Sequence, residues 1–199
     1  MFSCALTGYY LTIIMRDNME FEIKRAFPED ADGLFFIMEE VTAGIANPEW
    51  FIDDDADYIR AHIGHIPLAG EDCGFTLKAV TQIDGREVIA GFFMVDFPGT
   101  GVRNLGHHIA LSEEKLAKAA HMDSVVVLPQ FRGHKLQYRL ITAAEEVLRR
   151  ETDYTIWMAT VHPDNGYSLD NVRAHGYEVV AEAVKYGGYR RYVLMKELL

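Results

Sequence analysis

Apolar side chains recur in regular patterns along the second half of the chain. Runs rich in β-branched residues predict strands over 121–128 and 154–161. Between them, residues 133–150 carry apolar side chains at helical spacing and charged side chains on the opposite face, which predicts an amphipathic helix. Its apolar stripe consists of Leu136, Leu140, Ile141, Ala144, Val147 and Leu148. The elements that follow are a helix over 165–175 and strands that begin at Tyr177 and Tyr189. This alternation indicates a mixed α/β fold.

The first regular pattern along the chain begins close to Met19. Alternating residues over 20–24 predict a strand. Residues 1–18 stand apart from this pattern, so we expect them to form a dispensable N-terminal extension. The proline and acidic residues of Pro28-Glu29-Asp30 suit a helix N-terminus, and we expect this helix to end near Gly44.

The middle of the chain predicts a hairpin followed by an insertion. In chain order, the elements are a helix over 54–63, strands over 75–82 and 88–97, a loop over 98–111 and a helix over 112–120. Asp84-Gly85 marks the turn between the two strands, and Ser112 is a suitable cap for the last helix. Because one hydrophobic core is economical at this length, we expect residues 19–199 to form a single domain.

Composition narrows the class of protein. With 49% hydrophobic and 25% charged residues, the 199-residue chain has the balance of a globular domain. Its net charge of −11 opposes binding to nucleic acid and to anionic membrane surfaces. Cys4 and Cys73 lie far apart, and no apolar run approaches the roughly 20 residues that span a bilayer, so we expect a cytoplasmic protein. The acidic balance favours cationic substrates such as polyamines, although it is also common for solubility alone.

One segment passes from a strand through an Arg-Gly turn directly into a helix. It reads Val125-Val126-Val127-Leu128-Pro129-Gln130-Phe131-Arg132-Gly133-His134-Lys135-Leu136-Gln137. The free N–H groups of a helix N-terminus attract anions, with each charge–dipole contact worth roughly 0.3–1 kcal/mol. Gly133 allows a ligand to approach the backbone, and Arg132 and Lys135 add full charges. The same spacing also fits an ordinary strand-to-helix turn, so pyrophosphate binding stays open at this point.

This segment resembles the phosphate-binding motif of the GNAT acyltransferase superfamily. That motif reads Q/R-x-x-G-x-G/A, and residues 130–135 match it except at the last place. A second segment, residues 162–177, resembles the family's sequence of strand end, asparagine, helix and Gly-aromatic pair. The two segments occur in the family's order and separation. Together with the strand order before them, the resemblance covers residues 19–197.

The resemblance implies an α/β fold with a mixed, mostly antiparallel central sheet of about six to seven strands and helices on both faces. It also implies that two of these strands splay apart into a V-shaped cleft, where acetyl-CoA binds as cosubstrate without a metal. The pantetheine arm then pairs with the open strand edge as an added strand would. The implied cofactor-binding residues are Val125, Val126, Val127, Arg132, Gly133, His134, Lys135, Leu136, Gln137, Asn165 and Asn171. For Asn165 and Asn171, the alternative is that they only cap or pin the helix.

The sequence departs from the family pattern at two positions. Lys135 replaces a small residue, which predicts a turn wound less tightly around the diphosphate. Val172 stands where many relatives carry a tyrosine that protonates the departing thiolate. We therefore expect another acid, such as Tyr167, Tyr186, Tyr189 or solvent, to take that role.

His121 and Asp123 are the candidate catalytic residues. Alignment with the family's strand places His121 where some relatives carry a glutamate base, and Asp123 projects from the same face two residues later. An imidazole with an ordinary pKa near ~6.5 suits deprotonation of an ammonium. The alternative is that His121 only closes the preceding helix.

These residues lead to a hypothesis about function. We expect an N-acetyltransferase that acts on the primary amine of a small molecule, with Tyr186 and Tyr189 beside the substrate pocket. The alternatives are a protein N-terminal or lysine acetyltransferase and a catalytically silent acyl-CoA-binding module. No metal is expected, because the pairs His62/His65 and His107/His108 lack completing ligands. The sequence leaves the oligomeric state open, a homodimer included.

Overall fold

The computed structural model describes residues 19–63 and 73–198. The predicted N-terminal extension over 1–18, which includes Cys4, lies outside the described residues, and so does His65. Phe21 and Ala26, at the beginning of the described chain, are already buried in the core.

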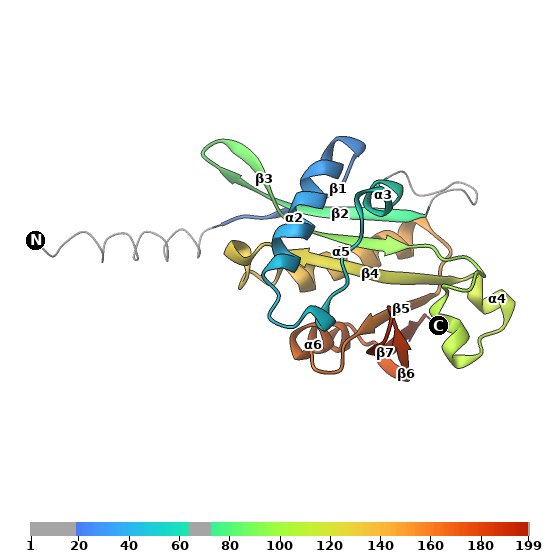
Figure 1. Ribbon diagram of the computed structural model, residues 1–199. Helices are drawn as coiled ribbons and strands as arrows, with labels where there is room; N and C mark the ends of the chain where they lie inside the picture. The colour runs from blue at the N-terminus through green and yellow to red at the C-terminus, as the bar shows by residue number, and fades with distance from the viewer. Residues whose placement is uncertain (1–18, 64–72, 199) are drawn as a thin grey trace, which may run out of the picture.

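The central sheet has seven strands in the order β1-β2-β3-β4-β5-β7-β6 (Figure 1). Neighbouring strands are antiparallel except for β4 and β5, which are parallel. The strands are β1 (Glu22–Arg25), β2 (Gly74–Ile83), β3 (Arg86–Asp96), β4 (Ala119–Val127), β5 (Ile156–Val161), β6 (Glu178–Lys185) and β7 (Tyr189–Glu197). This confirms the predicted mixed, mostly antiparallel sheet.

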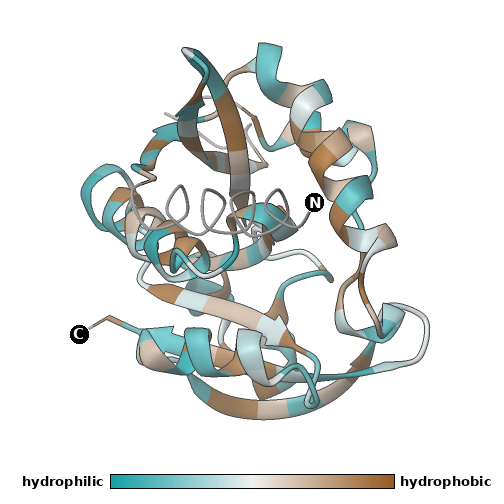
Figure 2. Ribbon diagram, turned by 90° about the vertical axis from the view of Figure 1, so that its left-hand side faces the viewer, coloured by the Kyte–Doolittle hydropathy of each residue, from teal (hydrophilic) through white to brown (hydrophobic). Residues whose placement is uncertain are grey.

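Helices cover the sheet, with α2 and α5 on opposite faces (Figure 1). The helices are α2 (Ala31–Ala43), α3 (Ala56–Ala61), α4 (Glu113–Leu116), α5 (Leu136–Glu151) and α6 (Gly166–Ala174). Short 3-10 turns are η1 (Pro28–Asp30), η2 (Pro48–Trp50), η3 (Leu105–Ile109) and η4 (Pro129–Phe131). The helices show bands of both hydrophilic and hydrophobic colour in Figure 2, as expected for elements with one face on a core.

The apolar stripe of α5 is buried as the sequence predicts. Leu140 and Leu148 are fully buried and join a core that includes Phe92 of β3 and Trp157 of β5. Because α5 contacts β2, β3 and β4, burial of this stripe fixes the helix across the middle of the sheet. The start of α5 is therefore held in a constant position relative to the end of β4.

Strands β4 and β5 pair at one end and then separate. Their backbone register runs only from Ala119–Ile156 to His121–Met158, and Figure 1 shows the strands diverging beyond it. On its other side β4 stays paired with β3 as far as Val127. The backbone edge of β4 that faces β5 is consequently open from Met122 onward, which confirms the predicted splay.

A β-bulge in β4 coincides with the point of divergence. Phe93 of β3 pairs with Val125 and Val95 pairs with Met122, so Asp123 and Ser124 together face one residue of β3. Bulges bend a strand and redirect its side chains. Asp123 of the bulge lines the space between the separated strands, and the Ser124 hydroxyl donates to Asp54.

Several predicted boundaries were wrong by a few residues. The helix predicted over 112–120 ends at Leu116, and β4 begins at Ala119. His121 therefore lies inside a strand, which excludes the alternative that it closes a helix. The helix predicted from Gly133 begins at Leu136, because Gly133 and Lys135 have φ values of 94° and 57°, outside the helical region.

Candidate active site

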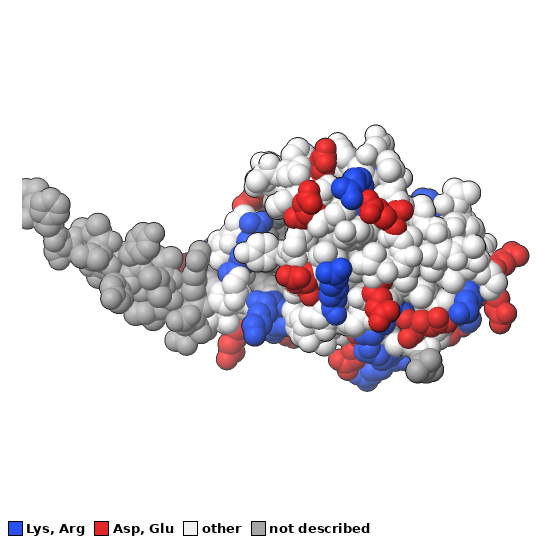
Figure 3. Space-filling view, turned by 90° about the horizontal axis from the view of Figure 1, so that it is seen from below, with Lys and Arg blue, Asp and Glu red and all other residues white. Residues whose placement is uncertain are grey.

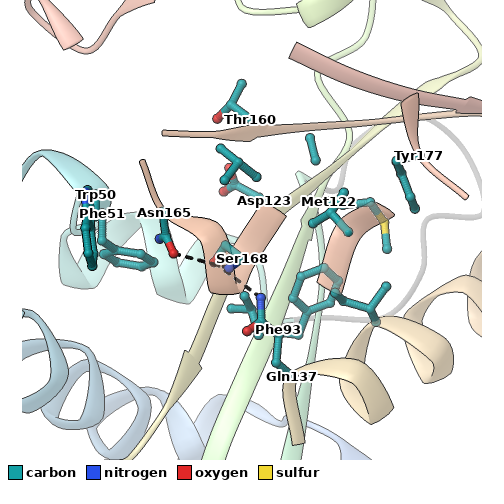
Figure 4. A pocket seen from close by; sticks show the side chains of 15 residues that line it. Trp50, Phe51, Phe93, Met122, Asp123, Gln137, Thr160, Asn165, Ser168 and Tyr177 are labelled. Atoms are coloured by element: carbon teal, nitrogen blue, oxygen red, sulfur yellow. Dashed lines mark hydrogen bonds between the residues drawn. The ribbon is translucent and has the colours of Figure 1, made fainter. Parts of the chain in front are cut away.

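A cleft lies between the separated parts of β4 and β5 (Figure 4). It encloses a cavity of about 70 Å³. Val125, Ala159 and Val161 contribute from the strands, Gln137 and Ile141 from α5, Asn165, Ser168 and Val172 from α6, and Trp50 and Phe51 from the segment after α2. The cleft is therefore bounded by one open strand edge, two helix N-terminal regions and an aromatic segment.

The turn between β4 and α5 has the geometry of an anion site. Lys135, in left-handed conformation at the N-cap position, supplies no side-chain cap to α5. The first N–H groups of the helix are thus available to a ligand. A side chain at Gly133 would meet nothing within 4 Å, so its backbone is open to approach. Arg132 and Lys135 are exposed beside it. Lys135 adopts the backbone conformation that glycine would favour.

The predicted cofactor-binding residues divide into two groups. Val125, Gln137 and Asn165 line the cleft. Asn165 also caps α6, because its Oδ1 accepts a hydrogen bond from the Ser168 N–H, so the helix-capping alternative holds at the same time. Asn171 does not line the cleft; its Nδ2 donates to the Tyr167 carbonyl, which pins α6.

The remaining predicted residues do not line the cleft. The Val126 side chain is buried in the core, and its carbonyl oxygen points toward Gly91 of β3 rather than toward the open edge. The centroid of the His134 ring lies 5.0 Å from that of Phe21, and Leu136, the first residue of α5, is buried in the core. Any contact of these three residues with a ligand in the cleft is consequently limited to main-chain groups or the ring edge of His134.

A second and larger cavity, of about 240 Å³, adjoins the cleft. Its walls come from the segment before and within α3, the insertion after β3, and the end of β6: Ile52, Asp54, Tyr58, Asp96, Arg103, Leu105, His121, Met158, Lys185 and Tyr186. Met122, Asp123, Ala159 and Thr160 line both cavities. These four residues mark the junction between the two cavities.

Asp123 carries the only carboxylate among the residues shared by the two cavities. Its Oδ2 accepts a hydrogen bond of 2.8 Å from the Tyr58 hydroxyl. Burial raises the pKa of Asp123 above its usual range, against the opposing effect of that hydrogen bond. A carboxylate with a raised pKa is a stronger base, and its position at the junction suits proton abstraction.

Asp54 is a second carboxylate of this site, and the sequence did not single it out. Its Oδ2 accepts a 2.7 Å hydrogen bond from Ser124, the other residue of the bulge. Burial, followed by the negative charge of Asp123, raises the pKa of Asp54 to about 7. Asp54 lies 69 residues from Asp123 in sequence and joins it only through tertiary packing, so no local pattern could reveal it.

His121 belongs to a buried network with Asp96 of β3 and His62, which follows α3. The two carboxylate oxygens of Asp96 lie 3.1 Å from His62 Nε2 and 3.3 Å from His121 Nδ1. Although burial favours the neutral acid, these hydrogen bonds hold the pKa of Asp96 below its usual range. The Leu105 N–H donates to His121 Nε2 at 3.1 Å. Both ring nitrogens of His121 are therefore already engaged.

Two buried side-chain polar atoms in the described part of the chain lack a hydrogen-bond partner, the indole Nε1 of Trp50 and the hydroxyl of Tyr177. Both residues line the cleft. Buried donors in folded proteins are nearly always paired, so an unpaired donor in a cavity indicates a missing partner. Trp50 thus favours a ligand that brings a hydrogen-bond acceptor into the cleft.

The predicted substrate-binding tyrosines differ in position. Tyr186 lines the larger cavity, and its hydroxyl lies 3.2 Å from Thr160 Oγ1 at the junction. Tyr189 lines neither cavity and packs beside Arg191 on β7. Only Tyr186 is in position to contact a substrate.

The described residues were also compared with the features of metal, membrane and nucleic-acid sites. No group of three or more His, Cys, Asp and Glu side chains within 19–63 and 73–198 is arranged to hold a metal ion. In the same two segments, no helix has both the length and the apolar character to cross a bilayer. On the face shown in Figure 3, basic and acidic side chains are interspersed, without an extended basic surface for nucleic acid.

Comparisons with known proteins agree with this geometry. Residues 45–177 match the family model described as acetyltransferase (GNAT) family. These residues contain α3, the residues that line the cleft and the junction, and the turn before α5. No curated protein sequence matches the chain.

Many solved structures share the fold. A putative acetyltransferase, yncA from Salmonella typhimurium with its cofactor acetyl-CoA, has a TM-score of 0.61 at 18% identity, covering 89% of this chain and 94% of that one. Arabidopsis thaliana NAA60 in complex with a bisubstrate analogue gives 0.66 at 11% identity, covering 90% and 100%. A ribosomal-protein-alanine N-acetyltransferase from Brucella melitensis gives 0.61 at 19% identity, covering 89% and 99%. At such identities the likeness concerns the fold.

Proposed function

The chain belongs to the GNAT family of acetyltransferases, and from this premise we propose that it transfers an acetyl group from acetyl-CoA to the primary amine of a small molecule. The observation that carries the proposal is the junction of two cavities at Met122, Asp123, Ala159 and Thr160. One cavity suits a thioester along the open strand edge, and the other suits an acceptor. Asp123 stands where the reacting atoms of both would meet.

Several groups of this chain fit acetyl-CoA. The free N–H groups at the start of α5, with Arg132 and Lys135 beside them, would hold its diphosphate. The open edge of β4 at Val125–Val127 would pair with its pantetheine amides, and the unpaired Trp50 Nε1 would donate to one of its oxygens. When bound, this cosubstrate supplies an activated acetyl thioester.

Asp123 is the proposed general base. An amine enters as its ammonium ion and loses one proton to the Asp123 carboxylate, while the Tyr58 hydroxyl keeps that carboxylate oriented. The nitrogen–carbon bond then forms as the carbon–sulfur bond breaks, and a second amine proton leaves with the thiol. Because both His121 nitrogens are engaged, His121 would accept a proton only after losing its bond from Leu105. We therefore propose that His121 helps to position Asp96 and the insertion after β3, which it contacts at the Leu105 N–H.

The hydroxyl pair of Thr160 and Tyr186 is the proposed route for the proton that reaches the thiolate. Val172 lines the cleft without a proton to give, as the sequence predicts. Thr160 lines both cavities and lies 3.2 Å from the Tyr186 hydroxyl. Tyr167, another predicted candidate, has 86% of its surface exposed and lines neither cavity.

The second candidate acceptor is a protein N-terminus or lysine. The fold is shared with a ribosomal-protein-alanine N-acetyltransferase and with the NatC complex bound to Gag peptide and CoA, which supports this alternative. Three separate segments wall the larger cavity, from the α3 region, the insertion and the end of β6. An acceptor cavity walled on three sides favours a small molecule over a long peptide.

A kinetic experiment tests the proposal. Thiol release from acetyl-CoA with a panel of primary amines should be detectable, and Asp123→Asn should reduce its rate constant by ~10²–10⁴-fold while calorimetry shows CoA affinity nearly unchanged. Because the pKa of Asp123 is raised, the wild-type rate should fall as pH drops through that pKa, and the variant should lose this limb. Asp153→Asn, at an exposed pair with Lys118, is the matched control.

Two results would contradict this assignment. CoA binding without thiol release for any amine would favour the silent acyl-CoA-binding module. A larger rate loss for His121→Ala than for Asp123→Asn, shrinking as pH rises, would make His121 the base instead.

A further inference from the structure

The cavity proposed to bind the acceptor carries unpaired charges of opposite sign. Within the described residues, the ion pairs on its wall all involve Asp96, which pairs with His62, Arg103 and His121. The other charged groups of the wall, Asp54, Asp123 and Lys185, take part in no ion pair of the described chain.

The acidic pair comes from the segment before α3 and from the bulge of β4. Asp54 accepts a hydrogen bond from the Ser124 hydroxyl and Asp123 accepts one from the Tyr58 hydroxyl, so both partners are neutral. Burial raises the pKa of both carboxyl groups, which means that their negative charges are poorly compensated. An ammonium ion between them would supply the missing charge.

Lys185 ends β6 and faces the same cavity. Burial lowers the pKa of its ammonium group, and no other group offsets this effect. Its neighbours include the Tyr186 ring, 5.6 Å from Nζ, and His108, whose pKa is lowered first by burial and then by the charge of Lys185. An anionic ligand group beside Lys185 would compensate a charge that the described protein leaves unpaired.

Arg103, the other cationic side chain of the wall, is less suited than Lys185 to pair with an anionic ligand group. Arg103 Nη2 lies 3.4 Å from Asp96 Oδ1, and the negative charges of Asp96 and Asp123 help to raise the Arg103 pKa against the effect of burial. Its charge is therefore shared with carboxylates already in place. Lys185 remains the unpaired positive group of the described wall.

We propose that the acceptor is a primary amine that also carries an anionic group, a carboxylate or a phosphate ester, with its ammonium at Asp54 and Asp123 and its anionic group at Lys185. This inference rests on the proposed function. Transfer removes the charge of the amine and leaves the anionic group unchanged. Lys185 would therefore determine specificity and would take no part in the chemical step.

Matched acceptor pairs test this inference. Thiol release gives kcat/KM for phenylalanine against phenethylamine, and for phosphoethanolamine against ethanolamine. The anionic member of at least one pair should be preferred by about tenfold or more, the usual worth of a charge-assisted hydrogen bond. The pair that shows the preference distinguishes a carboxylate from a phosphate.

Variants of Lys185 locate the source of the preference. Lys185→Met should bring the ratio of kcat/KM within the preferred pair close to one, and Lys185→Arg should retain most of it. Lys115→Met, whose side chain pairs with Glu197 and lines neither cavity, should leave the ratio unchanged.

The possible failures are distinguishable. Plain amines that react as well as their anionic partners, or a preference that survives Lys185→Met, would overturn this inference and leave the proposed function intact. Absence of thiol release with every amine, plain or anionic, would overturn the proposed function and this inference with it.

Discussion

At the scale of single residues, the positions of protons around Asp96 follow from the partners of each nitrogen. His62 Nδ1 faces the Tyr58 carbonyl at 2.7 Å and Nε2 faces Asp96 at 3.1 Å. Both partners accept hydrogen bonds, so the protonated ring, which donates from both nitrogens, satisfies both contacts. Burial alone would lower the pKa of His62, but the bonds to Asp96 and Tyr58 raise it. The His62 ring lies 4.1 Å from the ring of Tyr58, whose hydroxyl donates to Asp123.

Trp50 provides a direct reporter of ligand binding. The chain has two tryptophans. Trp157 is fully buried and donates to the Tyr154 carbonyl, whereas Trp50 lines the cleft and its buried Nε1 has no partner among the described residues. CoA should therefore change the tryptophan fluorescence, and Trp50→Phe should abolish the change and weaken CoA affinity by roughly 2- to 12-fold, the worth of one hydrogen bond.

Trp157→Phe is the matched control for this measurement. It should keep a CoA-dependent fluorescence change, because Trp50 remains in the cleft. A full-sized change in Trp50→Phe would show that CoA does not contact this indole.

The sequence predicted residues of this site only where a local motif marks them. Asp123 and His121 were visible because they lie on the same strand as the phosphate motif. Asp54, Tyr58, Asp96 and Lys185 come from the α3 region, β3 and β6 and share no spacing with that motif. Their proximity depends on how β3, β4 and the α3 region pack, which a linear pattern does not contain.

At the scale of elements, the turn from β4 into α5 connects the strand edge to the helix N-terminus. Packing of the α5 stripe against β2, β3 and β4 fixes where its free N–H groups point. The conformations of Gly133 and Lys135 shift the helix start to Leu136. The proposed pyrophosphate site is thus built mainly from backbone N–H groups. A substitution there should change CoA affinity through the charge or the bulk of the new side chain.

Gly133 offers a sharp test of this element. Gly133→Asp places a negative charge at the proposed phosphate site, so calorimetry should show loss of CoA binding. The positive φ of 94° disfavours any side chain, which makes Gly133→Ala the matched control for backbone strain. The alanine variant should keep most of the affinity, because a side chain there meets nothing within 4 Å. Unchanged affinity in a folded Gly133→Asp variant would contradict the assignment.

Element type was more predictable than element length. The sequence predicted α5 and β4 correctly. The apolar stripe of α5 repeats over several helical turns, and the β-branched residues of β4 follow one another along the strand. The helix predicted over 112–120 was wrong beyond Leu116, since Ala119 and Ala120 pair with β5 in the sheet. Tertiary pairing overrides the local helical preference of alanine.

At the scale of the whole molecule, one sheet joins both halves of the chain. The first half supplies β1 to β3 and the second supplies β4 to β7, and the site forms where β4 leaves β5. The family's order of strands predicted this architecture through the resemblance. The bulge at Asp123 and Ser124 was not predictable, because it depends on the register between β3 and β4.

The contacts at the start of the described chain lead to a prediction about its domain boundary. Phe21 is 8% exposed and packs edge-on to Phe131, and its carbonyl accepts a hydrogen bond from Arg139 of α5. The Glu20 carbonyl accepts one from Thr81 of β2. We propose that a chain beginning at Met19 keeps all of these contacts and therefore keeps the cleft. Its melting temperature and its CoA affinity should lie close to those of the full chain. Starting instead at Ala26 removes β1 together with Phe21, and this shorter chain should melt several degrees lower, because burial of one large apolar side chain contributes roughly 1.5–3 kcal/mol. Aggregation, or a large loss of CoA affinity, in the chain that begins at Met19 would show that residues 1–18 belong to the catalytic domain.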